Sequence, residues 1–329
     1  MIRMHSTDPK ALSGVFPVLP TPFTADKQVD QASLRNLVRY LLLSGVDGMT
    51  FPGVASEVAQ LTETERDDLT RLVMQEVAGK VPVISGISSP TLATTKSLAV
   101  ASVAAGASAL MVAAPPNLKT TAEQISYFQA LSAAVPGAPL MLQNVPPPVG
   151  AGLEPAVVLE ILRAVPGIRY VKEETLPSGQ RLTAILAQAP ATLAGVFGGA
   201  GGRYITDELR RGAAGTMPAI ELAEVHVALF KAHRESNGAL VRNLFTRMLP
   251  ILNVQAVFRW SLTKYVLRRR GLIAHDAQRM AGPVLDILDR QDVDAFLHDV
   301  QDLLLPEAAL RACVTPNFTQ NLGAVHGAA

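Results

Sequence analysis

Three charged residues stand at the end of one apolar segment of the chain. The segment "IRYVK" (168–172) ends in Lys172, and Glu173 and Glu174 follow it directly. A lysine at the mouth of a dry interior tends to lose its proton, because a low dielectric disfavours the ammonium ion. The neutral amine can attack a ketone and form a Schiff base, which acidifies the neighbouring carbon. The alternative is that Lys172 only marks where a strand reaches water.

Glu174 is the second candidate, because residues two apart on a strand share a face. If the strand geometry continues to residue 174, Lys172 and Glu174 point the same way and Glu173 points to an ion pair or the surrounding helices. Glu174 can then act as a general acid or base on a bound imine. The alternative is a carboxylate that only holds the lysine or a water in place.

Two amides end another apolar segment, "PLMLQN" (139–144). The Gln143 and Asn144 side chains can orient a substrate hydroxyl or carboxylate through hydrogen bonds. Ordinary loop polarity explains them equally well.

A loop of small residues, "PGVASE" (52–57), follows a further apolar segment. Gly53 permits close approach of the backbone to a ligand. The amides of Ala55 and Ser56, with the Ser56 hydroxyl, are candidates for binding a carboxylate. Such loops are common, so this pattern alone is weak.

Eight short apolar segments must position these residues. They lack polar alternation, as strands buried on both faces do, and they cover 14–19, 48–51, 81–86, 109–114, 139–144, 168–172, 193–197 and 213–217. Helical patterns lie between them, and those over 30–45 and 61–79 carry capping residues in the right order. This alternation predicts an α/β fold, a closed parallel (β/α)8 TIM barrel, with its site at the carboxyl ends of the strands. A doubly wound open sheet is the rival, but it favours an early Gly-rich phosphate loop, and the chain shows none.

The predicted barrel covers residues 12–218. Strand signals stop there, and residues 219–313 read as a C-terminal helical extension with helices over 219–236, 238–252, 255–270 and 292–305. Residues 314–329 are predicted to be a flexible tail.

The composition excludes several classes of function. With 29 basic and 28 acidic side chains, no bulk field attracts nucleic acid or an anionic membrane. No apolar stretch is long enough to span a bilayer, and residues 1–10 lack the apolar run of a signal peptide. Cys313 is the single cysteine, which excludes an intrachain disulfide and fits a reducing cytoplasm. The six histidines are scattered, so we expect no metal site.

These segments together resemble the dihydrodipicolinate synthase / N-acetylneuraminate lyase family of Schiff-base lyases. The similarity covers about residues 12–275, and it is carried by "GVFPVLPTPF", "GVDGMTFPGVASEVAQLTETER", "GKVPVISGIS", "LMLQNVP" and "YVKEE". The resemblance implies a (β/α)8 barrel with C-terminal helices, no cofactor, and a homo-oligomer, dimer or tetramer. It also implies a small-molecule 2-keto acid as substrate and Lys172 as the residue that forms the imine.

The chain departs from the usual family pattern at three places. Its loop reads Gly53-Val54-Ala55-Ser56-Glu57 where the family usually has Gly-Thr-Thr-Gly-Glu or Gly-Ser-Thr-Gly-Glu. Gln143 stands in place of a proton-relaying tyrosine, and Pro148 in place of the arginine by which the synthases grip a carboxylate. These departures argue against a role in lysine synthesis.

One branch of the family shares the departures. The 2-keto-3-deoxy-L-arabonate dehydratases are similar in the glutamine, in the Ser-Glu pair and in a Lys-x-Glu-Thr motif matched by residues 172–175, which adds Thr175 as a binding candidate. The resemblance therefore predicts dehydration of a 2-keto-3-deoxy sugar acid, with catalytic residues Lys172, Glu174 and Gln143. The alternatives are aldol cleavage or condensation on the same imine, and a non-catalytic keto-acid sensor.

Overall fold

The eight predicted strands are present and form one sheet. The computed structural model describes residues 11–314, and its strand order is β1-β8-β7-β6-β5-β4-β3-β2. The strands are β1 (Gly14–Val15), β2 (Met49–Thr50), β3 (Val83–Gly86), β4 (Ala109–Ala113), β5 (Leu140–Asn144), β6 (Ile168–Glu173), β7 (Gly195–Gly198) and β8 (Gly215–Thr216). Val18, just after β1, forms a parallel bridge with Thr50 of β2.

A helix follows each strand. These helices are α1 (Gln31–Leu43), α2 (Glu63–Val77), α3 (Leu92–Ala104), α4 (Thr121–Ala134), α5 (Pro155–Ala164), α6 (Ser178–Ala187), α7 (Ile205–Arg210) and α8 (Ala223–Arg234). Alternating parallel strands and helices confirm the predicted (β/α)8 barrel. Four C-terminal helices follow α8 along the chain: α9 (Gly238–Phe258), α10 (Trp260–Arg269), α11 (Ile287–Asp299) and α12 (Glu307–Arg311).

The helix starts follow from the capping residues that the sequence showed. The Asp30 side chain accepts a hydrogen bond from the Ser33 N–H at the start of α1. Thr62 and Glu65 form a reciprocal capping box at the start of α2. Each cap satisfies N–H groups that have no partner inside the helix.

The chain divides into two compact units. The first comprises the chain up to Phe16 together with Pro82–Met217, and the second comprises Pro17–Val81 together with the chain from Pro218 onward. The division into a barrel over 12–218 and an extension over 219–313 stays a prediction. The predicted tail lies outside the described residues, apart from Val314.

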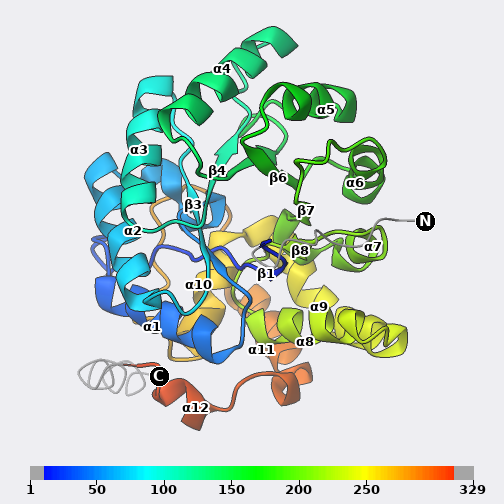
Figure 1. Ribbon diagram of the computed structural model, residues 1–329. Coiled ribbons are helices and arrows are strands. Elements are labelled where there is room, and N and C mark those ends of the chain that lie inside the picture. Colours follow the sequence, from blue (N-terminus) through cyan, green and yellow to red (C-terminus); the bar gives the residue numbers. More distant parts are fainter. Residues whose placement is uncertain (1–10, 315–329) are drawn as a thin grey trace. The chain divides into compact units, whose positions relative to one another are not determined.

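In the first unit, helices α3 to α7 pack one against the next along the outside of β4–β7 (Figure 1). Every pairing between its strands is parallel. On the inner side, the Phe197 ring packs edge-on against Phe16 and Tyr170, with centroid distances of 5.5 and 6.1 Å. Tyr170 lies two residues before Lys172, so the aromatic cluster identifies the inward face of β6.

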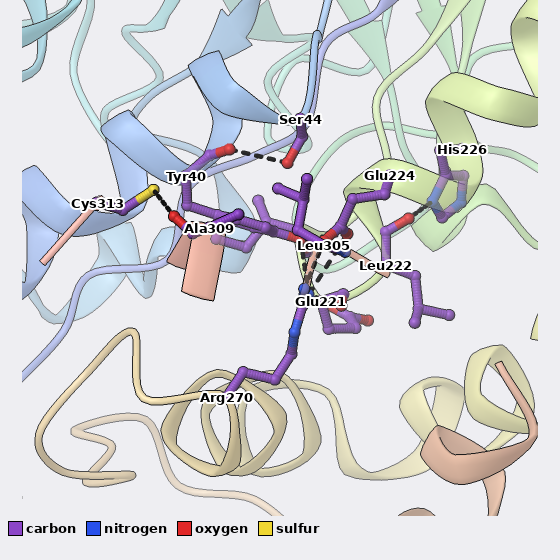
Figure 2. Close-up of polar contacts among 11 residues, drawn as sticks. Tyr40, Ser44, Glu221, Leu222, Glu224, His226, Arg270, Leu305, Ala309 and Cys313 are labelled. Atoms are coloured by element: carbon purple, nitrogen blue, oxygen red, sulfur yellow. Dashed lines mark hydrogen bonds and ion pairs between the residues drawn. The ribbon is translucent and has the colours of Figure 1, made fainter. Parts of the chain in front are cut away.

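In the second unit, a buried polar cluster joins α1, α8, α10 and the segment before α12 (Figure 2). Arg270 donates to the Tyr40 hydroxyl at 2.9 Å and pairs with Glu224, and the Tyr40 hydroxyl donates to Glu224 Oε2 at 2.6 Å. The Leu305 N–H donates to Glu224 Oε1 at 3.2 Å. Each of these buried charged and polar groups therefore has a partner, as a stable interior requires.

The described residues contain neither a membrane-spanning helix nor a metal-binding cluster. No described helix has the length and apolar character needed to cross a membrane. No group of three or more His, Cys, Asp or Glu residues within 11–314 is arranged to hold a metal ion.

Candidate active site

The structure brings Lys172 and Glu174 together near the carboxyl end of β6. Lys172 is 5% exposed, and its Nζ forms an ion pair with Glu174 Oε1. The Glu174 N–H donates to the Asn144 carbonyl at 2.8 Å, so strand pairing continues one residue past β6. That continuation is why residues 172 and 174 share a face, as the alternation predicted.

Gln143 is the third member of this cluster. It lies beside Lys172 in the parallel register of β5 and β6, and it is 4% exposed. Its Nε2 donates to Glu174 Oε2 at 3.3 Å. The carboxylate of Glu174 is therefore held by the amine through one oxygen and by the amide through the other.

Asn144 and Glu173 lie on the opposite face of their strands. Asn144 Nδ2 donates to Glu173 Oε2 at 2.8 Å and to the Leu153 carbonyl at 2.9 Å, and its Oδ1 accepts from the Leu153 N–H at 2.8 Å. These bonds occupy the Asn144 side chain with protein partners. It is not among the residues that the structure brings to Lys172, and its contact with substrate stays a prediction.

Glu173 has the ion pair that the alternation predicted, since Arg181 Nε lies 3.5 Å from Glu173 Oε1. Burial raises the pKa of Glu173, against the Asn144 hydrogen bond, the Thr175 N–H and the charge of Arg181. Thr175 donates its N–H to Glu173 Oε1 at 2.8 Å. The Thr175 hydroxyl is buried without a hydrogen-bond partner within residues 11–314, and its contact with substrate stays a prediction.

Two consecutive glycines at the end of β7 make room for carboxyl side chains. A Cβ atom added at Gly199 would meet Glu174 Cγ and Oε1 at 2.5 Å, and one added at Gly198 would meet Glu208 Oε2 at 1.8 Å. Real Cβ atoms do not approach other atoms so closely. Glu174 therefore reaches Lys172 across space that any other residue at 199 would fill.

Glu208 on α7 is a residue that the sequence analysis missed. It is 1% exposed, and Ser178 Oγ donates to its Oε1 at 2.7 Å. Burial raises its pKa to about 7, and the charges of Glu174, Asp207 and Glu173 act in the same direction. The sequence signal is faint, because an acidic residue in "TDELRR" looks like part of a solvated helix face.

The loop after β2 belongs to the second unit and includes the 3-10 turn Val54–Ser56. Ser56 is fully buried. Its hydroxyl donates to the Leu19 carbonyl at 2.5 Å and accepts from the Gly53 N–H at 2.8 Å, and its own N–H donates to the Gly53 carbonyl at 3.0 Å. Ser56 thus builds the loop with both of its polar groups. Carboxylate binding at Gly53, Ala55 and Ser56 stays a prediction.

A buried ion pair follows directly in the same unit and was also missed. Lys264 Nζ pairs with Glu57, and both side chains have no exposed surface. The N–H groups of Arg279 and Met280 donate to Glu57 Oε2 at 2.7 and 2.6 Å. Burial lowers the pKa of Lys264 to about 8, against the charge of Glu57. These contacts tie the loop to α10 and the segment after it.

The comparisons with known proteins concern the family and the fold of this chain. The model of the Dihydrodipicolinate synthetase family matches residues 11–298. L-2-keto-3-deoxyarabonate dehydratase of Azospirillum brasilense is 27% identical over 309 residues, which are 92% of this chain and 99% of that protein.

Two solved structures extend the comparison. Dihydrodipicolinate synthase from Rhodopseudomonas palustris superposes with a TM-score of 0.82 at 29% identity, over 90% of this chain and 100% of that one. YagE, a prophage protein of E. coli K12 solved in complex with pyruvate, superposes with a TM-score of 0.81 at 25% identity. The match covers 88% of this chain and 99% of that one. The first is a dihydrodipicolinate synthase, and the second is described as a member of the dihydrodipicolinic acid synthase family. This chain belongs to the dihydrodipicolinate synthetase family.

Proposed function

We propose that this protein is a Schiff-base-forming lyase that dehydrates a 2-keto-3-deoxy sugar acid. The observation that carries the proposal is the Glu174 carboxylate, which bonds the Lys172 amine and the Gln143 amide at once inside the first unit. An amine needs a proton acceptor before it attacks a ketone, and a carboxylate in direct contact is such an acceptor.

The proposed reaction begins with imine formation. Glu174 takes a proton from the Lys172 ammonium, and the neutral amine attacks the C2 carbonyl carbon of the substrate. The C2 oxygen takes one proton from the amine nitrogen and one from Glu174 and leaves as water, so the imine carries a positive charge and Glu174 is again a carboxylate. That charge draws electrons from C3 and weakens its C–H bonds.

Elimination follows on the same imine. Glu174 removes a proton from C3, and the electron pair of that bond forms a C3–C4 double bond. The C4–O bond breaks, and the hydroxyl leaves with a proton as water. Hydrolysis of the imine then releases the dehydrated keto acid and regenerates the Lys172 amine.

Gln143 supports dehydration over carbon–carbon cleavage. An amide donates hydrogen bonds but does not relay protons at neutral pH, so Gln143 orients Glu174, a substrate hydroxyl or the departing water. Elimination needs no second relay opposite Glu174, whereas aldol chemistry protonates and deprotonates a hydroxyl of the cleaved fragment. The dehydratase of Azospirillum brasilense, similar over nearly its full length, favours the same reaction.

Aldol cleavage or condensation on the same imine is the second candidate. The pyruvate bound to YagE favours it, because pyruvate is the keto-acid partner of such reactions in this chemistry. The two reactions break different bonds, and a product assay separates them. A non-catalytic keto-acid sensor would bind pyruvate and release no product.

The proposal also covers the cellular location and the oligomeric state of the enzyme. We propose a cytoplasmic homo-oligomer, a dimer or a tetramer, which light scattering of the purified protein measures directly.

The direct test is a screen of 2-keto-3-deoxy acids of different length and stereochemistry, with semialdehyde and pyruvate products both monitored. Dehydration predicts loss of water without pyruvate release from at least one acid. Pyruvate as the main product would favour the aldolase, and no product from any acid would favour the sensor. Lys172→Ala is the matched control and must abolish whichever product appears.

A further inference from the structure

Glu208 is a buried carboxyl that the proposed mechanism does not use. It lies on α7 with 1% of its surface exposed. Ser178 Oγ donates to its Oε1 at 2.7 Å, while its Oε2 has no hydrogen-bond partner within residues 11–314. A carboxylate in such a place would be costly, because burying an uncompensated charge costs several kcal/mol.

The position of Glu208 connects it to the candidate site. Its carboxyl occupies the space that a side chain at Gly198 would fill, and Glu174 occupies the space that one at Gly199 would fill. Consecutive residues of an extended segment direct their side-chain positions to opposite faces. Glu208 and Glu174 therefore pack against consecutive glycines of the same segment.

Glu208 has no cation of its own among the ion pairs within residues 11–314. Glu174 pairs with Lys172 and Glu173 with Arg181, so these two anions have two cations. On α7, Asp207 accepts from Arg210 and Arg211. Ser178 contacts Glu208, and the charges of Glu173, Glu174 and Asp207 act on it. The other charged groups on the neighbouring elements are Lys172 at the end of β6, Arg181 on α6, and Arg210 and Arg211 around α7. Each charged member of this set already has an oppositely charged partner other than Glu208.

Burial without a cationic partner favours the protonated form of Glu208 below about pH 7. Burial raises its pKa to about 7, the negative charges of Glu174, Asp207 and Glu173 add to that effect, and the Ser178 hydrogen bond opposes it. Ionisation above this pH adds a negative charge without a new cation. A nearby negative charge favours the ammonium form of an amine, and an ammonium ion is not nucleophilic.

We propose, on the basis of the proposed function, that Glu208 is a positioning residue of the site: its neutral carboxyl, behind the Gly198-Gly199 pair, keeps the Lys172–Glu174 pair in the charge state that attacks a ketone. Glu208 touches no substrate in this account. Its neutral carboxyl adds no negative charge near the Lys172–Glu174 pair, and this effect is lost when Glu208 ionises.

The protonation of Glu208 is tested by infrared difference spectra of the full chain between about pH 5 and pH 9. A carbonyl band of a protonated carboxyl should persist at pH 6, disappear near pH 7, and be absent from Glu208→Gln. Glu160→Gln, which removes an exposed carboxyl from α5 of the same unit, should retain the band. A band unchanged in Glu208→Gln overturns the proposal.

The role of Glu208 is tested by the initial rate at which borohydride traps pyruvate on the protein. Glu208→Gln should match the wild type near pH 6 and exceed it by about three- to tenfold near pH 8, where the wild-type charge opposes amine formation. Ser178→Ala removes the hydrogen bond that favours ionised Glu208. In this variant the inflection in the plot of trapping rate against pH should therefore lie at a higher pH than in the wild type. Glu160→Gln should follow the wild type throughout.

Two outcomes separate failure of this inference from failure of the proposed function. A wild type that traps pyruvate, with a Glu208→Gln rate altered equally at both pH values, overturns only the role of Glu208 and leaves it as a space-filling group. A wild type that traps no pyruvate at any pH overturns the proposed function and this role with it. If Glu208→Gln does not fold, Ser178→Ala decides, and an unmoved inflection overturns the proposal.

Discussion

Lys172 and Glu174, two positions apart at the end of β6, form a buried ion pair whose carboxylate is also bonded by Gln143. Both ends of the pair are thus fixed by neighbouring strands rather than by mobile loops. A proton acceptor held against an amine in a dry interior is what Schiff-base formation requires.

Gly199→Ala should disable the site without unfolding the protein. The φ of Gly199 is −141°, outside the left-handed region, and the atoms that a methyl group would meet are Cγ, Cδ and Oε1 of the Glu174 side chain. Glu174 must swing away from Lys172, and we expect kcat to fall by about 100-fold, the scale of losing a general acid–base group. Steady-state kinetics and the thermal midpoint measure the two effects.

Gly282→Ala is the control for this substitution, because the new methyl group would meet only the Trp260 ring at an ordinary 3.7 Å. It should leave kcat unchanged. Full activity in Gly199→Ala would show that the placement of Glu174 against Lys172 is dispensable.

Gln143→Leu should separate imine formation from turnover. The leucine keeps the approximate volume but removes the 3.3 Å hydrogen bond to Glu174 Oε2. Lys172 and its pairing to Oε1 remain, so borohydride trapping of pyruvate should stay within about threefold of the wild type. We expect kcat to fall by about tenfold, as the loss of one hydrogen bond to a charged group implies. Equal losses in trapping and turnover would contradict a role confined to orienting groups after the imine has formed.

Much of this arrangement was predictable from the sequence, because local rules govern it. Apolar runs located all eight strands, capping residues located the starts of α1 and α2, and strand alternation placed Lys172 with Glu174. Contacts between distant segments escaped prediction. Glu57 and Lys264 are 207 residues apart, and no local pattern links them.

The role of the Gly198-Gly199 pair was also not predictable from the sequence, because it depends on side chains from other segments. The segment "GVFGGAGG" is rich in glycine, and the structure uses two of these glycines to admit Glu174 and Glu208. Ser56 is a further case, since its hydroxyl is committed to Leu19 and Gly53. A sequence shows which group can bond but not which partner occupies it.

Glu208→Gln should change how stability depends on pH. Glu208 has its pKa raised to about 7 from the ordinary value of 4.5, so the folded state keeps a proton that the unfolded state loses. The stabilisation is complete below about pH 4.5 and is lost as pH rises to about 7. Across this window the free energy of unfolding of the wild type should fall by about 3 kcal/mol relative to the variant. Urea unfolding at several pH values measures it, and parallel curves would contradict the assignment.

Lys264→Met should destabilise the second unit. It leaves Glu57 buried beside two N–H donors but without its cation. Loss of one partner of a buried ion pair costs about 3–5 kcal/mol. The double variant Glu57→Gln with Lys264→Met should recover part of that loss, because no uncompensated charge remains. Additive losses in the double-mutant cycle would show that the two residues do not interact.

The central claim is that the Lys172 amine captures a keto acid covalently. The most direct measurement is borohydride reduction in the presence of pyruvate, followed by peptide mass spectrometry. The account predicts added mass on the peptide that contains Lys172, at that residue, and none in Lys172→Ala. Added mass on another lysine, or equal labelling of Lys172→Ala, would contradict it.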